Sequence, residues 1–180
     1  MTQKIKKIGL MTVILCAVMG TTSCSEEEVG GGSSQLVGTW TSVSATGEIK
    51  FSDESLSNTI NGKMASYDLT DMVIIDFDKE GKVRYADMGF LYKMYDYSLK
   101  NNLLTFTYNN GIDPNTYADL YKIEWNEDEF TLTHGGIFVG DIQSRVAYHL
   151  ADRELKASGQ GSASGMGVSS INLTIKFKKQ

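Results

Sequence analysis

Apolar and polar residues alternate along most of the chain after residue 70. In the stretch MVIIDFD, the side chains of Val73, Ile75 and Phe77 share one face, and Asp76 and Asp78 lie on the other. A two-residue period places successive side chains on opposite faces of an extended strand. The pattern therefore predicts strands with one buried and one solvent-facing side. The same period recurs in five further stretches: 82–85, 103–108, 120–125, 129–134 and 171–179.

Short polar segments separate these predicted strands. Residues 78–81 end in glycine, residues 100–102 contain two asparagines, and residues 126–128 are Asn-Glu-Asp. Glycine and asparagine adopt the left-handed conformations that tight hairpin turns need. Strands joined by such turns favour an antiparallel meander, and closing the sheet buries its apolar face and removes its edges. We therefore predict an all-β fold, a meander that closes into a β-barrel of about eight strands.

Two segments have less regular patterns. Residues 55–66, after the first strand, predict a short helix or a loop. In residues 142–156, Ile142, Val146 and Leu150 have helical spacing, whereas Val146, Tyr148 and Leu150 have the spacing of a strand. We favour a strand over residues 145–151.

Residues 1–23 have the layout of a secretory signal peptide. Lys4, Lys6 and Lys7 precede an apolar run over residues 8–19, and small residues follow at 20–23. The twelve residues of this run rise only about 18 Å as a helix, whereas a bilayer core is about 30 Å thick. Export therefore explains the segment better than a transmembrane anchor does, and we exclude it from the fold.

Cys24 directly follows these small residues, and the arrangement resembles the lipobox of bacterial lipoproteins. The resemblance implies that signal peptidase II cuts before Cys24, and that acyl chains are attached to its sulfur and new amino group. Thr21 stands where the lipobox usually has leucine. The alternative is cleavage nearby by signal peptidase I, which leaves Cys24 as an unpaired thiol. Cys16 lies within the signal, so no internal disulfide is expected.

Residues 24–35 are predicted to tether the folded part to a membrane. The segment 25–28, Ser-Glu-Glu-Glu, resembles the acidic tag that some Gram-negative gut bacteria use to send lipoproteins to the cell surface. The alternative interpretation is a soluble spacer. Residues 25–35 span about 20 Å as a flexible coil. We expect an outer-membrane lipoprotein of a Gram-negative bacterium, exposed on the surface or, alternatively, facing the periplasm.

The charge of the mature chain bears on its partners. Removal of the three lysines of the signal takes the formal net charge from −5 to −8. An acidic surface repels phosphate backbones, so we expect no nucleic-acid partner. The 145 residues from 36 to 180 contain no second linker and suffice for one domain with a sizeable core.

Candidate metal and catalytic chemistry is sparse. The acids at 76, 78, 80 and 87, with Gly81, follow the spacing of an EF-hand calcium loop. Predicted strands flank them instead of helices, so we prefer an acidic hairpin turn. His134 and His149 are the two histidines and do not make a zinc motif. No nucleophile-elbow motif occurs. We therefore predict no metal, no cofactor and no enzymatic activity.

The start of the domain carries a family resemblance. Gly38-Thr39-Trp40 forms a Gly-x-Trp on the first strand, which is characteristic of lipocalins. Residues 75–108 resemble the lipocalin-like domains of bacterial surface lipoproteins, and the similarity extends over about residues 36–180. The resemblance implies a barrel whose closed end is plugged by Trp40 and whose apolar cavity holds a small molecule. The residues that carry it in the middle stretch are Phe77, Gly81, Tyr85, Tyr97, Leu99, Asn102, Leu104, Thr105 and Phe106.

One feature departs from animal lipocalins, which stack a late arginine over the first tryptophan. The last predicted strand offers Lys176, Lys178 and Lys179 instead. A lysine can supply the cation–π contact but not the planar stacking of arginine.

Eight aromatic residues are candidates for the barrel lining. They either contact a ligand or fill the interior, because eight strands enclose a space little wider than side chains. Our first hypothesis is a membrane-anchored lipoprotein that binds a small apolar or amphipathic ligand. The alternative is a filled barrel that acts through protein–protein contacts or as an accessory module. A pocket of about 300 Å³ or more favours the first. The eight candidates are Trp40, Phe77, Tyr85, Phe106, Tyr108, Tyr121, Trp125 and Phe130.

Overall fold

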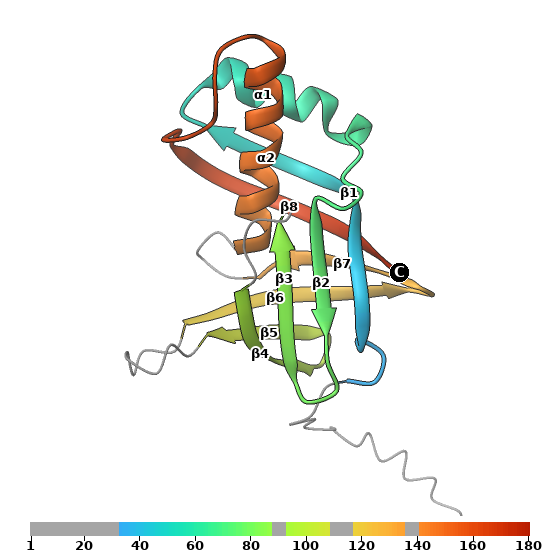
Figure 1. Cartoon of the computed structure of the whole chain (residues 1–180). Helices are drawn as coiled ribbons and strands as arrows, with labels where there is room; N and C mark the ends of the chain where they lie inside the picture. Colours follow the sequence, from blue (N-terminus) through green and yellow to red (C-terminus); the bar gives the residue numbers. More distant parts are fainter. Residues whose placement is uncertain (1–32, 88–92, 109–116, 136–140) are drawn as a thin grey trace, which may run out of the picture.

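The computed structural model describes residues 33–87, 93–108, 117–135 and 141–180 (Figure 1). Two α-helices occur in this part of the chain, α1 at Glu54–Lys63 and α2 at Asp141–Ala157, and the 3₁₀ turn η1 at Met64–Ser66 follows α1. The strands are β1 at Gly38–Phe51, β2 at Val73–Phe77, β3 at Lys82–Asp87, β4 at Lys93–Lys100, β5 at Leu103–Tyr108, β6 at Tyr117–Asn126, β7 at Glu129–His134 and β8 at Val168–Lys179.

The strands form a closed antiparallel barrel. Each strand pairs with the next in sequence, and β8 pairs with β1 to complete the ring. The alternation of the sequence corresponds to the alternation of burial: Val73, Ile75 and Phe77 on β2 are at most 1% exposed, while the residues between them are half-buried. The predicted meander and its closure are therefore confirmed.

The turns have the predicted backbone geometry. Asn101 and Asn102 both have positive φ between β4 and β5, and Gly81 has a φ of +84° between β2 and β3. In that β2–β3 turn the side chain of Asp78 accepts a hydrogen bond from the backbone N–H of Lys82 at 2.7 Å. The acidic segment with EF-hand spacing is thus a hairpin turn, as preferred.

Strands β1 and β8 extend beyond the barrel as a two-stranded ribbon. Strand β1 pairs with β2 only over residues 38–41, but it pairs with β8 from Trp40 to Phe51. The free edge of β1 is covered by α1, where the side-chain amide of Asn61 bonds both the N–H and the C=O of Ile49 at 2.9 Å. These bonds satisfy backbone groups that no neighbouring strand reaches.

Helix α1 confirms the helical alternative for residues 55–66. The side chain of Asp53 accepts a hydrogen bond from the N–H of Leu56 at 3.0 Å and caps the first turn. Capping of this kind satisfies an N–H group that has no partner within the helix. Leu56 and Ile60 are buried one turn apart and hold α1 against the core.

The strand predicted over residues 145–151 is wrong, because these residues belong to helix α2. The buried residues follow helical spacing over four turns, from Ile142 through Val146 and Leu150 to Ala151 and Leu155. The apparent two-residue period covered only Val146, Tyr148 and Leu150, and Tyr148 is 40% exposed. A stripe at i, i+4 and i+8 packs against the ribbon and α1 only as a helix.

The end of the barrel opposite the two helices is closed by aromatic packing around Trp40. Its ring lies 4.6 Å from that of Phe130, and its indole N–H donates a hydrogen bond to the backbone oxygen of Leu36 at 2.7 Å. The Nζ atom of Lys179 lies 5.3 Å from the centre of the Trp40 ring. The last strand therefore supplies the cation–π contact that a lysine was predicted to provide.

The two ends of the molecule differ in what they carry. The described chain begins at the closed end, next to Leu36, which is fully buried. Helices α1 and α2 lie at the other end, beside the protruding β1–β8 ribbon (Figure 1). Among the described residues, no helix is long and apolar enough to cross a membrane.

Candidate functional site

The predicted lining residues lie mostly in the core. Six of them are at most 2% exposed, namely Trp40, Phe77, Tyr85, Phe106, Tyr121 and Phe130. Trp125 is half-buried and Tyr108 is 42% exposed. The rings contact one another: the ring of Phe106 lies 5.2 Å from Tyr121 and 6.0 Å from Phe77, between centroids. The structure thus brings these aromatic side chains together as neighbours in one core.

Two tyrosines of β4 extend this aromatic cluster. Tyr95 lies between Tyr85 and Phe106, with centroid distances of 5.8 and 5.9 Å. The hydroxyl of Tyr97 donates to the backbone oxygen of Asp78, and burial, with a smaller effect of the Asp78 carboxylate, raises the pKa of Tyr97 to about 12. Neither was among the predicted lining residues, although both alternate with polar residues within 93–100.

The two histidines lie on different elements. His134 ends β7 with its ring 5.7 Å from that of Tyr121, and burial lowers its pKa while Asp119 acts against this shift. His149 lies on α2. The described residues contain no group of three or more His, Cys, Asp or Glu side chains that could hold a metal ion.

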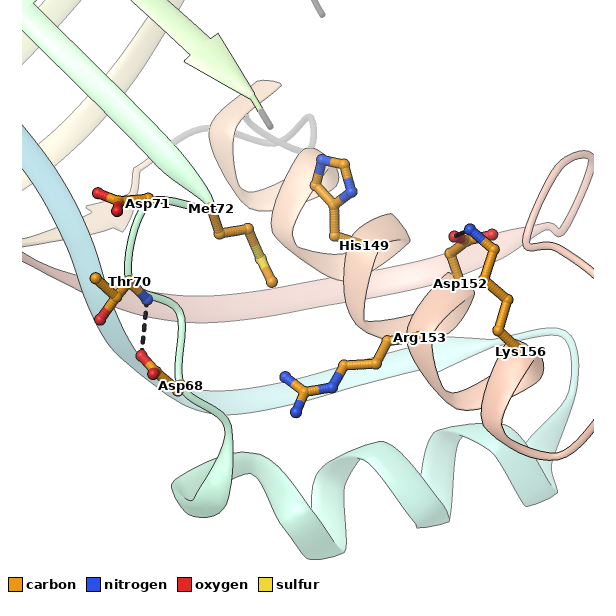
Figure 2. A pocket seen from close by; sticks show the side chains of 8 residues that line it. All are labelled: Asp68, Thr70, Asp71, Met72, His149, Asp152, Arg153 and Lys156. Atoms are coloured by element: carbon orange, nitrogen blue, oxygen red, sulfur yellow. Dashed lines mark hydrogen bonds and ion pairs between the residues drawn. The ribbon is translucent and has the colours of Figure 1, made fainter. Parts of the chain in front are cut away.

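A cleft of about 600 Å³ lies at the helical end of the molecule, between α2 and the segment 67–72 that connects η1 to β2. In Figure 2 the side chains of Met72 and Arg153 extend into the space between the two walls, whereas the carboxylate of Asp71 points away from α2. The segment contributes Asp68, Thr70, Asp71 and Met72, and α2 contributes His149, Asp152, Arg153 and Lys156.

Helical spacing explains why these four residues of α2 share a wall. Residues separated by three, four and seven positions lie on the same side of a helix. His149, Asp152, Arg153 and Lys156 have this spacing, and their side adjoins the buried stripe of α2. The packing of α2 on the ribbon therefore determines which side chains face segment 67–72.

Strand β1 holds the segment 67–72 in place. The buried hydroxyl of Ser42 donates to the backbone oxygen of Leu69 at 2.6 Å and accepts from the N–H of Val73 at 3.0 Å. The hydroxyl of Thr41 donates to the carboxylate of Asp71 at 3.0 Å and accepts from its N–H at 2.9 Å. This wall of the cleft is therefore fixed by the fold, which reduces the ordering cost of binding a ligand.

The other acids of the cleft also have partners. Asp68 accepts a hydrogen bond from the N–H of Thr70, and the hydrogen bonds from Thr70 lower the pKa of Asp68. Asp152 pairs with Lys156 at 2.5 Å, one helical turn away. The hydrogen bond from Lys156 is the main reason why the pKa of Asp152 lies below its usual value. Both carboxylates are therefore ionised and already bonded within the protein.

Arg153 contributes a cation to the cleft. Its guanidinium carbon lies 5.5 Å from the centre of the Tyr67 ring. The hydroxyl of Tyr67 donates to Glu154 at 2.9 Å, and Glu154 pairs with Lys63 of α1 at 2.6 Å. The hydrogen bond from Lys63 lowers the pKa of Glu154, and burial, followed by the Glu154 contact, raises the pKa of Tyr67. This series of contacts holds the ring on which the guanidinium rests.

A smaller hollow adjoins the cleft. It has a volume of about 380 Å³ and shares His149 and Asp152 with the cleft. Its other wall is the loop after α2, where the N–H of Ala163 donates to Asp152 at 3.3 Å. Asp152 therefore also fixes this loop to the helix.

Gln143 lies in the middle of the buried stripe of α2 and is 1% exposed. Ile142 and Val146 lie on one side of it and Ala147 on the other, all fully buried. Neither amide atom of Gln143 has a hydrogen-bond partner in the part of the chain that the structure describes. A buried polar group without a partner costs about 1–3 kcal/mol of stability.

Replacing Gln143 with methionine is expected to raise the free energy of unfolding by about 2 kcal/mol, because a side chain of similar shape removes the unpaired amide. Urea unfolding followed by circular dichroism measures the change. The matched control is Gln160→Met, at an exposed position in the loop after α2, for which the change should stay within about 0.5 kcal/mol. A less stable Gln143→Met protein would mean that the amide has a partner in solution.

The fold and the cleft define a closed antiparallel β-barrel whose protruding β1–β8 ribbon carries two helices and a ligand-sized cleft. No family model, no curated protein and no solved structure matches the chain.

Proposed function

We propose that this protein is a membrane-anchored, non-catalytic binding protein. In this proposal acyl chains on Cys24 hold the chain at the outer membrane of a Gram-negative bacterium, and a small amphipathic molecule binds in the cleft between α2 and segment 67–72. The observation that carries the proposal is the cleft itself, about 600 Å³ in volume and with one wall fixed by β1. Ligand pockets in proteins commonly measure about 300–1,000 Å³.

The arrangement of side chains supports a site at the helical end. The predicted lining residues pack on one another, with centroid distances such as 4.6 Å for Trp40 and Phe130, and so serve the core. The cleft combines charged groups with Met72, whose flexible thioether side chain adapts to apolar ligands of different shape. We therefore retain the predicted ligand class but place the ligand beside α2.

The direction of the tether also fits this function. The described chain starts at the closed end of the barrel, whereas the cleft lies at the end with the helices (Figure 1). Two or three acyl chains on Cys24, each methylene contributing about 0.8 kcal/mol, would hold the closed end near the membrane. The cleft would then open away from the lipid surface, where a solute can reach it.

Mass spectrometry of the protein purified from membranes of its own host tests both parts of the proposal. We expect an intact mass that includes acyl groups on Cys24, and a native mass that includes a co-purifying small molecule. The variant Thr70→Trp, which places a large ring at the exposed wall of the cleft, should lose the small molecule.

The matched control is Thr46→Trp, at an exposed position of β1 that does not line the cleft. This variant should keep both the acyl groups and the small molecule. A chain that starts elsewhere or lacks acyl groups would refute the anchor. A stable partner protein with no small molecule would favour the accessory-module alternative instead.

A further inference from the structure

We infer that the cleft recognises a molecule with one carboxylate and an apolar body, and that Arg153 binds the carboxylate. This inference rests on the proposed function and specifies its ligand. Among the described residues, Arg153 makes no hydrogen bond or ion pair, and its guanidinium contacts the face of the Tyr67 ring.

The other charged side chains of the cleft already have partners. Asp68 bonds the N–H of Thr70, Asp71 bonds the hydroxyl of Thr41, and Asp152 pairs with Lys156. A ligand gains less from groups that already have a partner of opposite charge or a hydrogen bond, because part of their bonding capacity is used. The donors of Arg153 have no such partner among the described residues. The cleft therefore offers the donors of Arg153 for a new hydrogen bond. In addition to the hydrogen bonds that these groups accept, the charge of Arg153 also acts on the carboxylates of Asp68 and Glu154 and lowers the pKa of both.

The position of Arg153 suits recognition of a planar anion. Figure 2 shows its side chain reaching from α2 toward the wall that contains Asp68 and Thr70. The ring of Tyr67 supports the guanidinium from one side, and the pairs Tyr67–Glu154 and Glu154–Lys63 fix that ring. A guanidinium held by stacking keeps its N–H groups in a fork that matches the two oxygens of a carboxylate.

The carboxylates around the cleft disfavour a doubly charged anion more than a singly charged one. Asp68, Asp71 and Asp152 all line the cleft, so a dianion such as a phosphate monoester meets stronger repulsion than a carboxylate does. A cationic ligand that approaches Arg153 is repelled by its guanidinium, and the carboxylates of the cleft offset part of this repulsion. The apolar part of the ligand would contact Met72, which is 9% exposed and lines the same cleft. A ligand with one negative charge beside Arg153 and an apolar body beside Met72 fits these two side chains.

Isothermal titration calorimetry with a matched series of probes tests the inference. The probes are decanoate, decanol, decylamine and decyl phosphate, and the proteins are the full chain and its Arg153→Gln and Arg153→Lys variants. We expect the full chain to bind decanoate at least about tenfold more tightly than decanol, which corresponds to about 1.4 kcal/mol. Arg153→Gln should remove this preference without changing the affinity for decanol, and Arg153→Lys should retain part of it.

The control is Arg84→Gln on the barrel wall. Arg84 does not line the cleft, and its guanidinium lies 2.8 Å from the carboxylate of Asp76. This variant should bind decanoate as the unaltered chain does. Equal binding of decanoate and decanol, or tighter binding of decyl phosphate or decylamine, would overturn the carboxylate assignment while leaving a binding protein. Absence of binding for all four probes, together with no co-purifying small molecule, would instead refute the proposed function. Circular dichroism of each variant confirms that its fold is intact.

Discussion

Replacing Gly47 with alanine is expected to lower the free energy of unfolding by about 4 kcal/mol. Gly47 lies on β1 opposite Leu173 of β8, with a φ of +123°. A Cβ atom at this position would lie 2.0 Å from the backbone oxygen of Asn172. The substitution therefore adds backbone strain of about 1–3 kcal/mol to the cost of forcing two strands apart, also about 1–3 kcal/mol. Urea unfolding monitored by circular dichroism measures the sum.

The effect should extend to the cleft, because the β1–β8 ribbon carries the helices that enclose it. The matched control is Gly159→Ala, where φ is +73° and a Cβ atom meets nothing within 4 Å. Strain alone should then cost about 1 kcal/mol, and the cleft should be unaffected. Equal losses at the two positions would mean that the close approach of Gly47 to β8 is not the cause.

The barrel was predictable because local and global signals agreed. Each strand of the meander has a clear two-residue period, and Gly81, Asn101 and Asn102 mark turns with the required positive φ. Neighbouring strands in sequence are neighbours in space, so no long-range pairing except β1 with β8 had to be inferred. Agreement of this kind between local and global signals allows a fold to be predicted from a single sequence.

Helix α2 was not predicted because its decisive contacts are tertiary. Val146 and Leu150 satisfy both a two-residue and a four-residue period, and a short apolar pattern does not separate the two. The packing of α2 against β8 and α1 selects the helix over the strand. This packing depends on the ribbon that β1 and β8 form beyond the barrel. The length of that ribbon has no local signature in the sequence.

The cleft was missed for the same reason. Only a helix over residues 141–157 brings the ion pair Asp152–Lys156 to the same helix face as His149 and Arg153. A strand over these residues does not predict this arrangement. Met72 and Thr70 belong to no motif and reach the cleft through the bonds of Ser42 and Thr41. By contrast, the alternation of the strands was enough to predict that the aromatic candidates are buried. The acylation of Cys24 stays a prediction.

Trp40→Ala is expected to lower the free energy of unfolding by about 4 kcal/mol, the usual cost of deleting a large buried aromatic side chain. Trp40 is 2% exposed, and its ring contacts Phe130, Trp125 and the Nζ atom of Lys179. Trp40→Phe should lose about half as much, because the smaller ring fills part of the space but leaves the buried oxygen of Leu36 without its hydrogen bond.

The matched control is Trp125→Ala in the same cluster. Trp125 is half-buried, and its ring lies 6.0 Å from that of Trp40 and 5.4 Å from that of Phe130. Trp125 buries less apolar surface on folding than Trp40 does, so Trp125→Ala should lower the free energy of unfolding by about 2 kcal/mol. Since Trp40 closes the barrel at the end where the described chain begins, its removal should also expose Leu36 to proteolysis. If the two alanine variants lost the same stability, closure of this end would depend on the cluster as a whole and not on the bond between Trp40 and Leu36.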